Sequence, residues 1–170
     1  MEVNRRDEPL LSAPAAPPFR IKKMLVPIDF SDCSKKALQY ALPLAQQHQA
    51  ALALLYVVPA PKYRPAEYGE IDYALFEADL RASGEKELAT LAAGEFHGKV
   101  PVDSVIRTGS PGIQIVKLAK NLPADIIVIS THGRSGLKHV LLGSVAEHVV
   151  RHAPCPVLVV REREHEFLAP

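Results

Sequence analysis

The sequence predicts an α/β protein with a single open, doubly wound sheet of five parallel strands and helices on both faces. Three observations lead to this fold class. Five short apolar runs alternate along the chain with segments of helical period, which is the order of a β-α-β protein. The runs are apolar at nearly every position, as expected for strands buried on both faces. The 170 residues are enough for one domain of this kind with a substantial core.

The first strand and helix are predicted from the stretch that begins with "IKKMLVPID". This apolar run covers residues 21–29. Residues 31–50 then carry alanine and leucine at helical spacing, with Ser31 or Asp32 as the cap. Pro43 lies inside this segment and removes one backbone hydrogen bond, so we expect a single helix that bends there.

Two more strands alternate with two more helices in the middle of the chain. "AALALLYVV" predicts a strand over 50–58, and the spacing of leucine and alanine predicts a helix over 71–93. "VPVDSVIRT" predicts a strand over 100–108. The next helix should begin near Pro111, because proline is favoured in the first helical turn.

The last part of the chain contains an unusually long connection. "ADIIVIS" predicts a strand over 124–130, followed by a helix over 144–152 and a final strand, "PVLVVRE", over 156–162. The loop between 130 and 144 is rich in glycine, basic and hydroxyl side chains. Strand-to-helix loops usually need about two to six residues. We therefore expect this longer loop to hold a ligand.

The ends of the strands suggest which ligand this is. Open α/β sheets bind ligands outside the carboxyl ends of their strands, where strand order reverses. Asp29 closes the first strand, Val57 lies near the end of the second, and the long loop follows the fourth. If the first and fourth strands are neighbours, Asp29 faces that loop, which ends at a phosphate-attracting helix N-terminus. This arrangement fits a nucleotide, although the sequence has neither a Walker A motif nor Gly-x-Gly-x-x-Gly.

Purely structural roles are the alternatives for three of these residues. "SVAE" could form a capping box between Ser144 and Glu147, which would occupy the N–H groups that a phosphate needs. Gly143 could be required only for a positive φ before the helix. Asp29 could cap the first helix together with Ser31.

Composition excludes several classes of function. The formal charge of +1 gives no basic field for nucleic acid, and the apolar runs are too short to span a bilayer. The N-terminus lacks a signal pattern, and Cys33 and Cys155 are far apart, so we expect a reduced, cytoplasmic protein. His132 and His139 lie near no third ligand at metal spacing, so we assign no metal site.

One pattern resembles a known family. Gly133 is followed by nine residues and then by Gly143-Ser144, "VPIDFSD" lies near the start, and "LLGSVAEHVVRHAPCPVLVV" lies near the end. From Lys22 to Arg161 the chain resembles the universal stress proteins, whose ATP-binding members carry Gly-x-x-Gly, nine residues and Gly-Ser/Thr. The first glycine of that signature is Ser130 here. The resemblance implies a Rossmann-like sheet with strand order 3-2-1-4-5.

The resemblance also implies a ligand and its contacts. The ligand would be ATP, with or without Mg²⁺. Asp29 would contact the ribose, and the backbone of Val57 would contact adenine. The phosphate contacts would come chiefly from backbone N–H groups of the loop and the next helix, with Ser130 offering its hydroxyl and Arg134 as a further neighbour; these residues are Ser130, Gly133, Arg134, Gly143, Ser144 and Val145.

Three functions remain open from the sequence. The first is a nucleotide-binding regulatory module of the stress response, acting as a homodimer that pairs through the last strand, Pro156 to Arg161, with no nucleic-acid or membrane partner. The second is a protein-interaction module of the same fold without nucleotide, which Ser130 favours. The third is a slow ATPase, but the loop carries no acid, so we assign no catalytic residue. The domain should cover 21–162, between a disordered leader (1–20) and a tail (163–170).

Overall fold

The structure is a computed structural model that describes residues 20–60, 73–95, 98–133 and 142–161. The leader predicted over 1–20 lies outside these ranges except for its last residue. The tail predicted over 163–170 also lies outside them, and so does Arg134.

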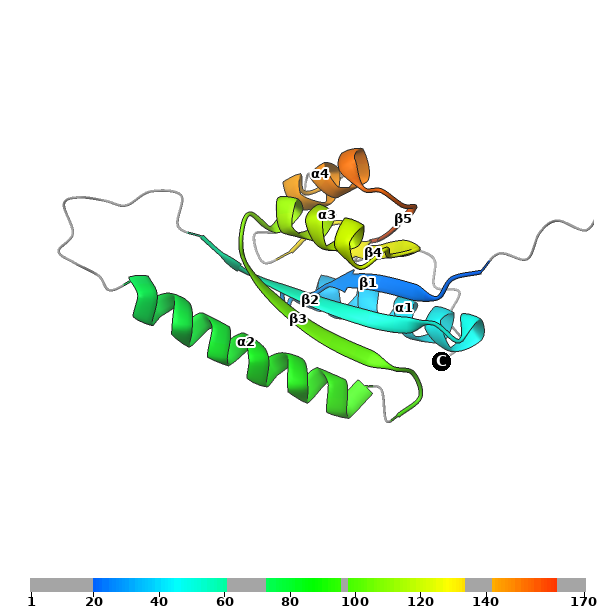
Figure 1. Cartoon of the computed structure of the whole chain (residues 1–170), viewed down its shortest axis with the longest axis horizontal. Coiled ribbons are helices and arrows are strands. Elements are labelled where there is room, and N and C mark those ends of the chain that lie inside the picture. The colour runs from blue at the N-terminus through cyan, green and yellow to red at the C-terminus, as the bar shows by residue number, and fades with distance from the viewer. Residues whose placement is uncertain (1–19, 61–72, 96–97, 134–141, 162–170) are drawn as a thin grey trace, which may run out of the picture.

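Five parallel strands form one sheet, with helices on both faces (Figure 1). The strands are β1 (Lys23–Pro27), β2 (Ala51–Pro59), β3 (Val102–Gly109), β4 (Ile126–Ser130) and β5 (Val157–Val160). The helices are α1 (Asp32–His48), α2 (Tyr73–Glu95), α3 (Pro111–Asn121) and α4 (Ser144–His152). The order β3-β2-β1-β4-β5 confirms the predicted fold class and strand order.

Every predicted element is present, and the differences concern where the elements end. The first strand is two residues shorter at each end than the apolar run over 21–29, because that run continues beyond the paired backbone. Helix α1 is a single helix with Pro43 inside it, as predicted. Its N-cap is Ser31, whose side chain accepts a hydrogen bond from the backbone N–H of Ser34.

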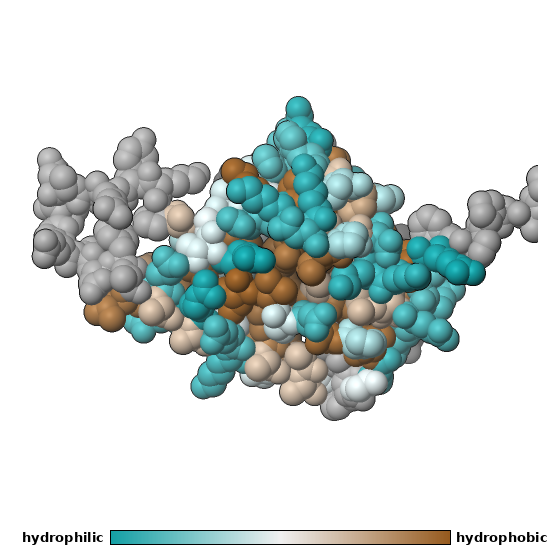
Figure 2. Space-filling view, viewed as in Figure 1, coloured by the Kyte–Doolittle hydropathy of each residue, from teal (hydrophilic) through white to brown (hydrophobic). Residues whose placement is uncertain are grey.

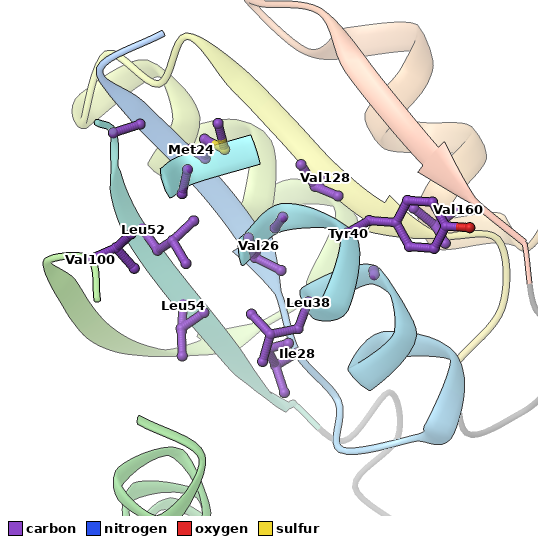
Figure 3. Close-up of a cluster of buried hydrophobic side chains, with 14 of the residues drawn as sticks. Met24, Val26, Ile28, Leu38, Tyr40, Leu52, Leu54, Val100, Val128 and Val160 are labelled. Carbon is purple, nitrogen blue, oxygen red and sulfur yellow. The ribbon is translucent and has the colours of Figure 1, made fainter. Parts of the chain in front are cut away.

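Two apolar cores cover the two faces of the sheet. Alternate residues of β1 and β2, among them Met24, Val26, Leu52 and Leu54, pack with α1 and with Leu88 of α2 on one face. Figure 3 shows these four strand residues together with Leu38 and Tyr40 of α1. The other face packs against α3 and α4 through a second cluster that includes Leu25, Leu55, Ile115, Ile127 and Val149. The strands read as continuous apolar runs because both of their faces are buried.

The surface seen in the view of Figure 1 is apolar in its centre. Figure 2 shows hydrophobic side chains gathered between α3 and α2, with hydrophilic side chains around them. Val105 of the edge strand β3 is half-buried and packs against the α3 core. No helix of the described ranges is long and apolar enough to cross a membrane.

Strand register brings the predicted ligand contacts to one level. β1 pairs with β2 as Pro27 to Leu55, and with β4 as Leu25 to Ile127. Continued by the same offsets, these pairings set Asp29 beside Val57 on one side and beside Thr131 on the other. The fold thus gathers three separate segments at the carboxyl edge of the sheet.

Cys155 lies half-buried between α4 and β5. Burial raises the pKa of its thiol above the ordinary value, and the Asp125 carboxylate raises it further. A raised pKa keeps the thiol protonated at neutral pH, and a protonated thiol is a poor nucleophile.

Truncation of two leucines on α2 should test the packing of this helix. Leu88 is 1% exposed and Leu75 is 64% exposed. We expect Leu88→Ala to lower the free energy of unfolding by about 2–5 kcal/mol. Leu75→Ala on the same helix is the matched control and should change it by less than about 0.5 kcal/mol. Urea denaturation measures both, and equal losses would contradict the assignment of the buried face.

Candidate functional site

A cavity of about 290 Å³ opens at the carboxyl edge of the sheet. It is lined by the ends of β1, β2 and β4 and by the first turns of α3 and α4. All the described residues that the sequence predicted as nucleotide contacts line it: Asp29, Val57, Ser130, Gly133, Gly143, Ser144 and Val145. Residues from positions far apart in the chain therefore form one site.

The cavity has an apolar flank and a polar flank. Val57 and Pro59 of β2 and Pro111 and Ile115 of α3 supply apolar surface. The polar lining comes from the end of β4, the loop after it and the start of α4. Because β1 separates β2 from β4 in the sheet, Asp29 lies between the two flanks.

One carboxylate oxygen of Asp29 accepts hydrogen bonds from Ser31 at the start of α1. Its Oδ1 accepts hydrogen bonds from the Ser31 backbone N–H at 3.1 Å and from the Ser31 hydroxyl at 2.5 Å. That hydroxyl in turn accepts from the Ser34 N–H at 3.2 Å. The structural alternative is therefore correct in this respect, because Asp29 supports the cap through Ser31. Asp29 also lines the cavity, so the same residue belongs to both the helix start and the site.

The second oxygen of Asp29 explains Gly133. A Cβ atom added to Gly133 would overlap Asp29 Oδ2. Glycine is needed here because the carboxylate takes the space that a side chain would occupy. The first strand and the long loop thus face one another in direct contact, as the sequence analysis expected.

Position 143 requires glycine because a side chain has no room there, and not because of its backbone angle. Its φ of −69° is one that any residue adopts, so the proposed need for a positive φ is wrong. Its N–H donates to the Thr131 carbonyl at 2.8 Å, and an added Cβ would lie 2.8 Å from that same oxygen. A side chain at 143 would therefore push the start of α4 away from the end of β4.

The predicted capping box at α4 is also wrong. Gly143 is the N-cap, Ser144 is the first helical residue, and no side chain caps this end in the described part of the chain. The Glu147 carboxylate forms an ion pair with Arg151 at 2.9 Å, one turn further along the helix. The box fails because the helix begins at Ser144, one residue earlier than a cap at Ser144 requires. Without the box, no side chain of the described residues competes with an anion for the first-turn N–H groups of α4.

Ser130 adopts a backbone that suits serine. It is the last residue of β4 and is 7% exposed. The non-glycine residues with positive φ in the described ranges are Phe30 and Gln49, so Ser130 is not strained. Its hydroxyl donates to the His132 carbonyl at 2.8 Å and thereby ties down the first turn of the loop. The departure from glycine is accommodated without distortion.

Sequence reasoning missed part of the lining. Pro59, Pro111 and Ile115 form apolar wall, and Thr131 is buried beside Ser130. His132 was considered only for metal or catalysis, but it lines the cavity with Nδ1 3.0 Å from the Thr131 hydroxyl. The sequence did contain a signal for the residues of α3: in a parallel α/β sheet each helix begins at the same edge at which the preceding strand ends.

Metal ligands do not gather in the part of the chain that the structure describes. No three histidine, cysteine, aspartate or glutamate side chains lie close enough together there to hold an ion. His139, the other histidine of the loop, lies outside the described residues.

Comparison with known proteins gives the family. A family model, that of the universal stress protein family, matches residues 20–161. The chain belongs to the universal stress protein family.

Two relatives illustrate how far this similarity extends. A universal stress protein of Methanocaldococcus jannaschii is 35% identical over 147 residues, which is 85% of each chain. The structure of the universal stress protein UspA from Lactobacillus plantarum is 34% identical with a TM-score of 0.73, and the match covers 85% of this chain and 100% of that one. The likeness therefore covers the whole sheet and the site at its edge.

One solved universal stress protein contains a nucleotide. It is in complex with cAMP, is 30% identical to this chain and has a TM-score of 0.53, with 84% of this chain and 98% of that chain covered. Nucleotide binding therefore occurs in this family on the same fold.

The contact between Asp29 and Gly133 can be tested by a double-mutant cycle. We expect Gly133→Ala to lower the free energy of unfolding by about 1–3 kcal/mol, because the new methyl group displaces the carboxylate. In an Asp29→Ala background the same change should be neutral or slightly stabilising, since no positive φ requires glycine there. Denaturant titration of the four proteins measures the coupling. Equal effects of Gly133→Ala in both backgrounds would contradict the contact.

Proposed function

We propose that this universal stress protein is a regulatory module of the stress response that binds ATP, with or without Mg²⁺, and acts as a homodimer. The observation that carries the proposal is the cavity at the carboxyl edge, where Asp29, the end of β2 and the uncapped start of α4 meet. Its two flanks differ in polarity as the two ends of a nucleotide do.

The binding mode follows from the strand order. Adenine would lie on the apolar flank, against the backbone of Val57, and the ribose would lie beside Asp29 at the centre. The phosphates would lie on the polar flank, which Gly133, Gly143 and Ser144 line. The N–H groups of the first turn of α4, with the positive end of the helix dipole, would bind them.

The close contacts of Gly133 and Gly143 support this binding mode. A Cβ atom at Gly133 would overlap Asp29 Oδ2 and one at Gly143 would meet the Thr131 carbonyl, so a larger side chain at either position would move the loop or the start of α4. Ser130, which favoured a module without nucleotide, directs its hydroxyl to the His132 carbonyl and so adds no obstruction of its own. The relative in complex with cAMP supports the adenine nucleotide class.

We infer binding and signalling in place of rapid turnover. Hydrolysis needs a general base for water and carboxylates for Mg²⁺. Asp29 is the one carboxylate among the described residues that line the cavity, and its Oδ1 is held by Ser31. Turnover well above that of an Asp29→Ala variant would contradict this inference.

Calorimetric titration with ATP and Mg²⁺ tests nucleotide binding directly. Protein shown by mass analysis to carry no nucleotide should bind with about micromolar affinity. Gly143→Val should weaken binding by at least about tenfold, which is about 1.4 kcal/mol, because its side chain meets the Thr131 carbonyl. Gly94→Val is the matched control, since an added Cβ there meets nothing within 4 Å. Absence of binding in the native protein would favour the protein-interaction function.

Pairing of two copies through β5 can be tested at one backbone position. β5 is an edge strand, and its Pro156 and Val160 carbonyls accept hydrogen bonds from Ile127 and Thr131 on the β4 side. By alternation the N–H of Val159 faces the open edge. Val159→Pro should remove that donor and convert a dimer to a monomer in light scattering, with no β4 bond lost. A native protein that is monomeric, or a variant that stays dimeric, would contradict this mode of pairing.

A further inference from the structure

Phe30 lies next to the site in a backbone conformation that is rare for an aromatic residue. Its φ is 65°, in the left-handed region that favours glycine. The hydrogen bonds from Ser31 to Asp29 Oδ1 close a tight turn across it. A residue held in this region persists only where its surroundings determine it, and such residues cluster at functional sites.

The ring of Phe30 is held by Tyr56 on the neighbouring strand. The two ring centroids are 4.9 Å apart with an interplanar angle of 49°. Tyr56 is 5% exposed, lines the cavity and directly precedes Val57. Each ring therefore belongs to the chain neighbour of a residue that would hold the nucleotide, Phe30 next to Asp29 and Tyr56 next to Val57.

Helix α2 contacts Tyr56, the second residue of the aromatic pair. A Cβ atom added to Gly84 would overlap the Tyr56 ring at its Cδ1 and Cε1 atoms, so the ring packs directly on the helix backbone. Gly84 is not among the described residues that line the cavity. Glycine is unfavourable inside a helix, and the contact with the Tyr56 ring gives the packing reason for glycine at position 84.

These contacts form a continuous connection from α2 to the site. Gly84 contacts Tyr56, Tyr56 packs on Phe30, and the turn at Phe30 carries Asp29, whose second oxygen lies against Gly133. A ring with a neighbour on each side has little freedom to move without moving one of them. A shift of α2 toward the sheet would therefore displace the turn at Phe30 or the end of β2.

We propose that Phe30 and Tyr56 are positioning residues for the bound nucleotide, and that α2 controls nucleotide affinity through its contact at Gly84. The proposal rests on the nucleotide-binding function proposed above. It assigns α2 a regulatory role, since any partner that shifts this helix would change the affinity of a site that the helix does not line.

A pair of glycine substitutions on α2 tests the connection. Gly84→Ala should raise the dissociation constant for ATP by roughly three- to thirtyfold, because the methyl group displaces the Tyr56 ring. Gly94→Ala makes the same helix-favouring change where an added Cβ meets nothing within 4 Å, and should leave affinity unchanged. Equal affinities of the two variants would overturn the proposal.

Substitutions in the aromatic pair separate positioning from folding. Tyr56→Phe keeps the ring and should bind as the native protein does, whereas Tyr56→Leu should lose affinity. Phe30→Gly removes the ring but permits the positive φ, so it should fold and bind ATP more weakly. Thermal unfolding of each variant identifies loss of fold. Native affinity in both Phe30→Gly and Tyr56→Leu would overturn the positioning role.

A measurement without nucleotide distinguishes failure of this proposal from failure of the proposed function. The amide NMR signals of Ser31 and Gly133 report on the Asp29 carboxylate, since Ser31 donates to it and Gly133 contacts it. Gly84→Ala should shift both signals, and Gly94→Ala should shift neither. If native protein binds no ATP while these shifts occur, the nucleotide function fails and the connection stands. Absence of the shifts overturns the connection whatever the affinity.

Discussion

The placement of β1 between β2 and β4 is the constraint on which the site depends. Parallel pairing on both sides sets the ends of three strands at one level, so Asp29 lies between Val57 and Thr131. The connections that leave these ends must diverge, and the crevice between them becomes the cavity. Burial of both faces of β1 holds this register, because a slip of one residue would exchange the apolar residues of the two cores.

Close approach of backbone to neighbouring groups accounts for three glycines. At Gly133 the neighbour is the Asp29 carboxylate, at Gly143 the Thr131 carbonyl and at Gly84 the Tyr56 ring. None of the three has a positive φ, so each is glycine because a Cβ has no room. The three contacts join the long loop, the start of α4 and the outer helix α2 to the strand ends. The site is thus shaped by packing distances between elements more than by local backbone geometry.

Local strain and hydrogen bonding meet at the end of β1. Phe30 adopts a left-handed backbone while Asp29 and Ser31 on its two sides share a short hydrogen bond. The same few residues start α1, carry the carboxylate of the cavity and contact β2 through an aromatic ring. Because the start of α1 and the lining of the cavity depend on one turn, substitutions there should affect both stability and the shape of the cavity.

Apolar periodicity alone determined the element order, the fold class and the edge of the sheet at which a ligand site was predicted. Strands buried on both faces leave a nearly unbroken apolar pattern, and parallel strands end at a common edge. The glycine spacing between Gly133 and Gly143 carried the family resemblance, and the described residues that the resemblance implied line one cavity. Spacing could not give the reason for each glycine, so the positive φ proposed for Gly143 and the capping box at Ser144 were wrong. Only the tertiary structure decided those questions. It also showed that Asp29 bonds to Ser31 and contacts Gly133, that α3 supplies an apolar wall, and that Gly84 contacts Tyr56. Each depends on distances between segments far apart in the chain, which no local pattern records.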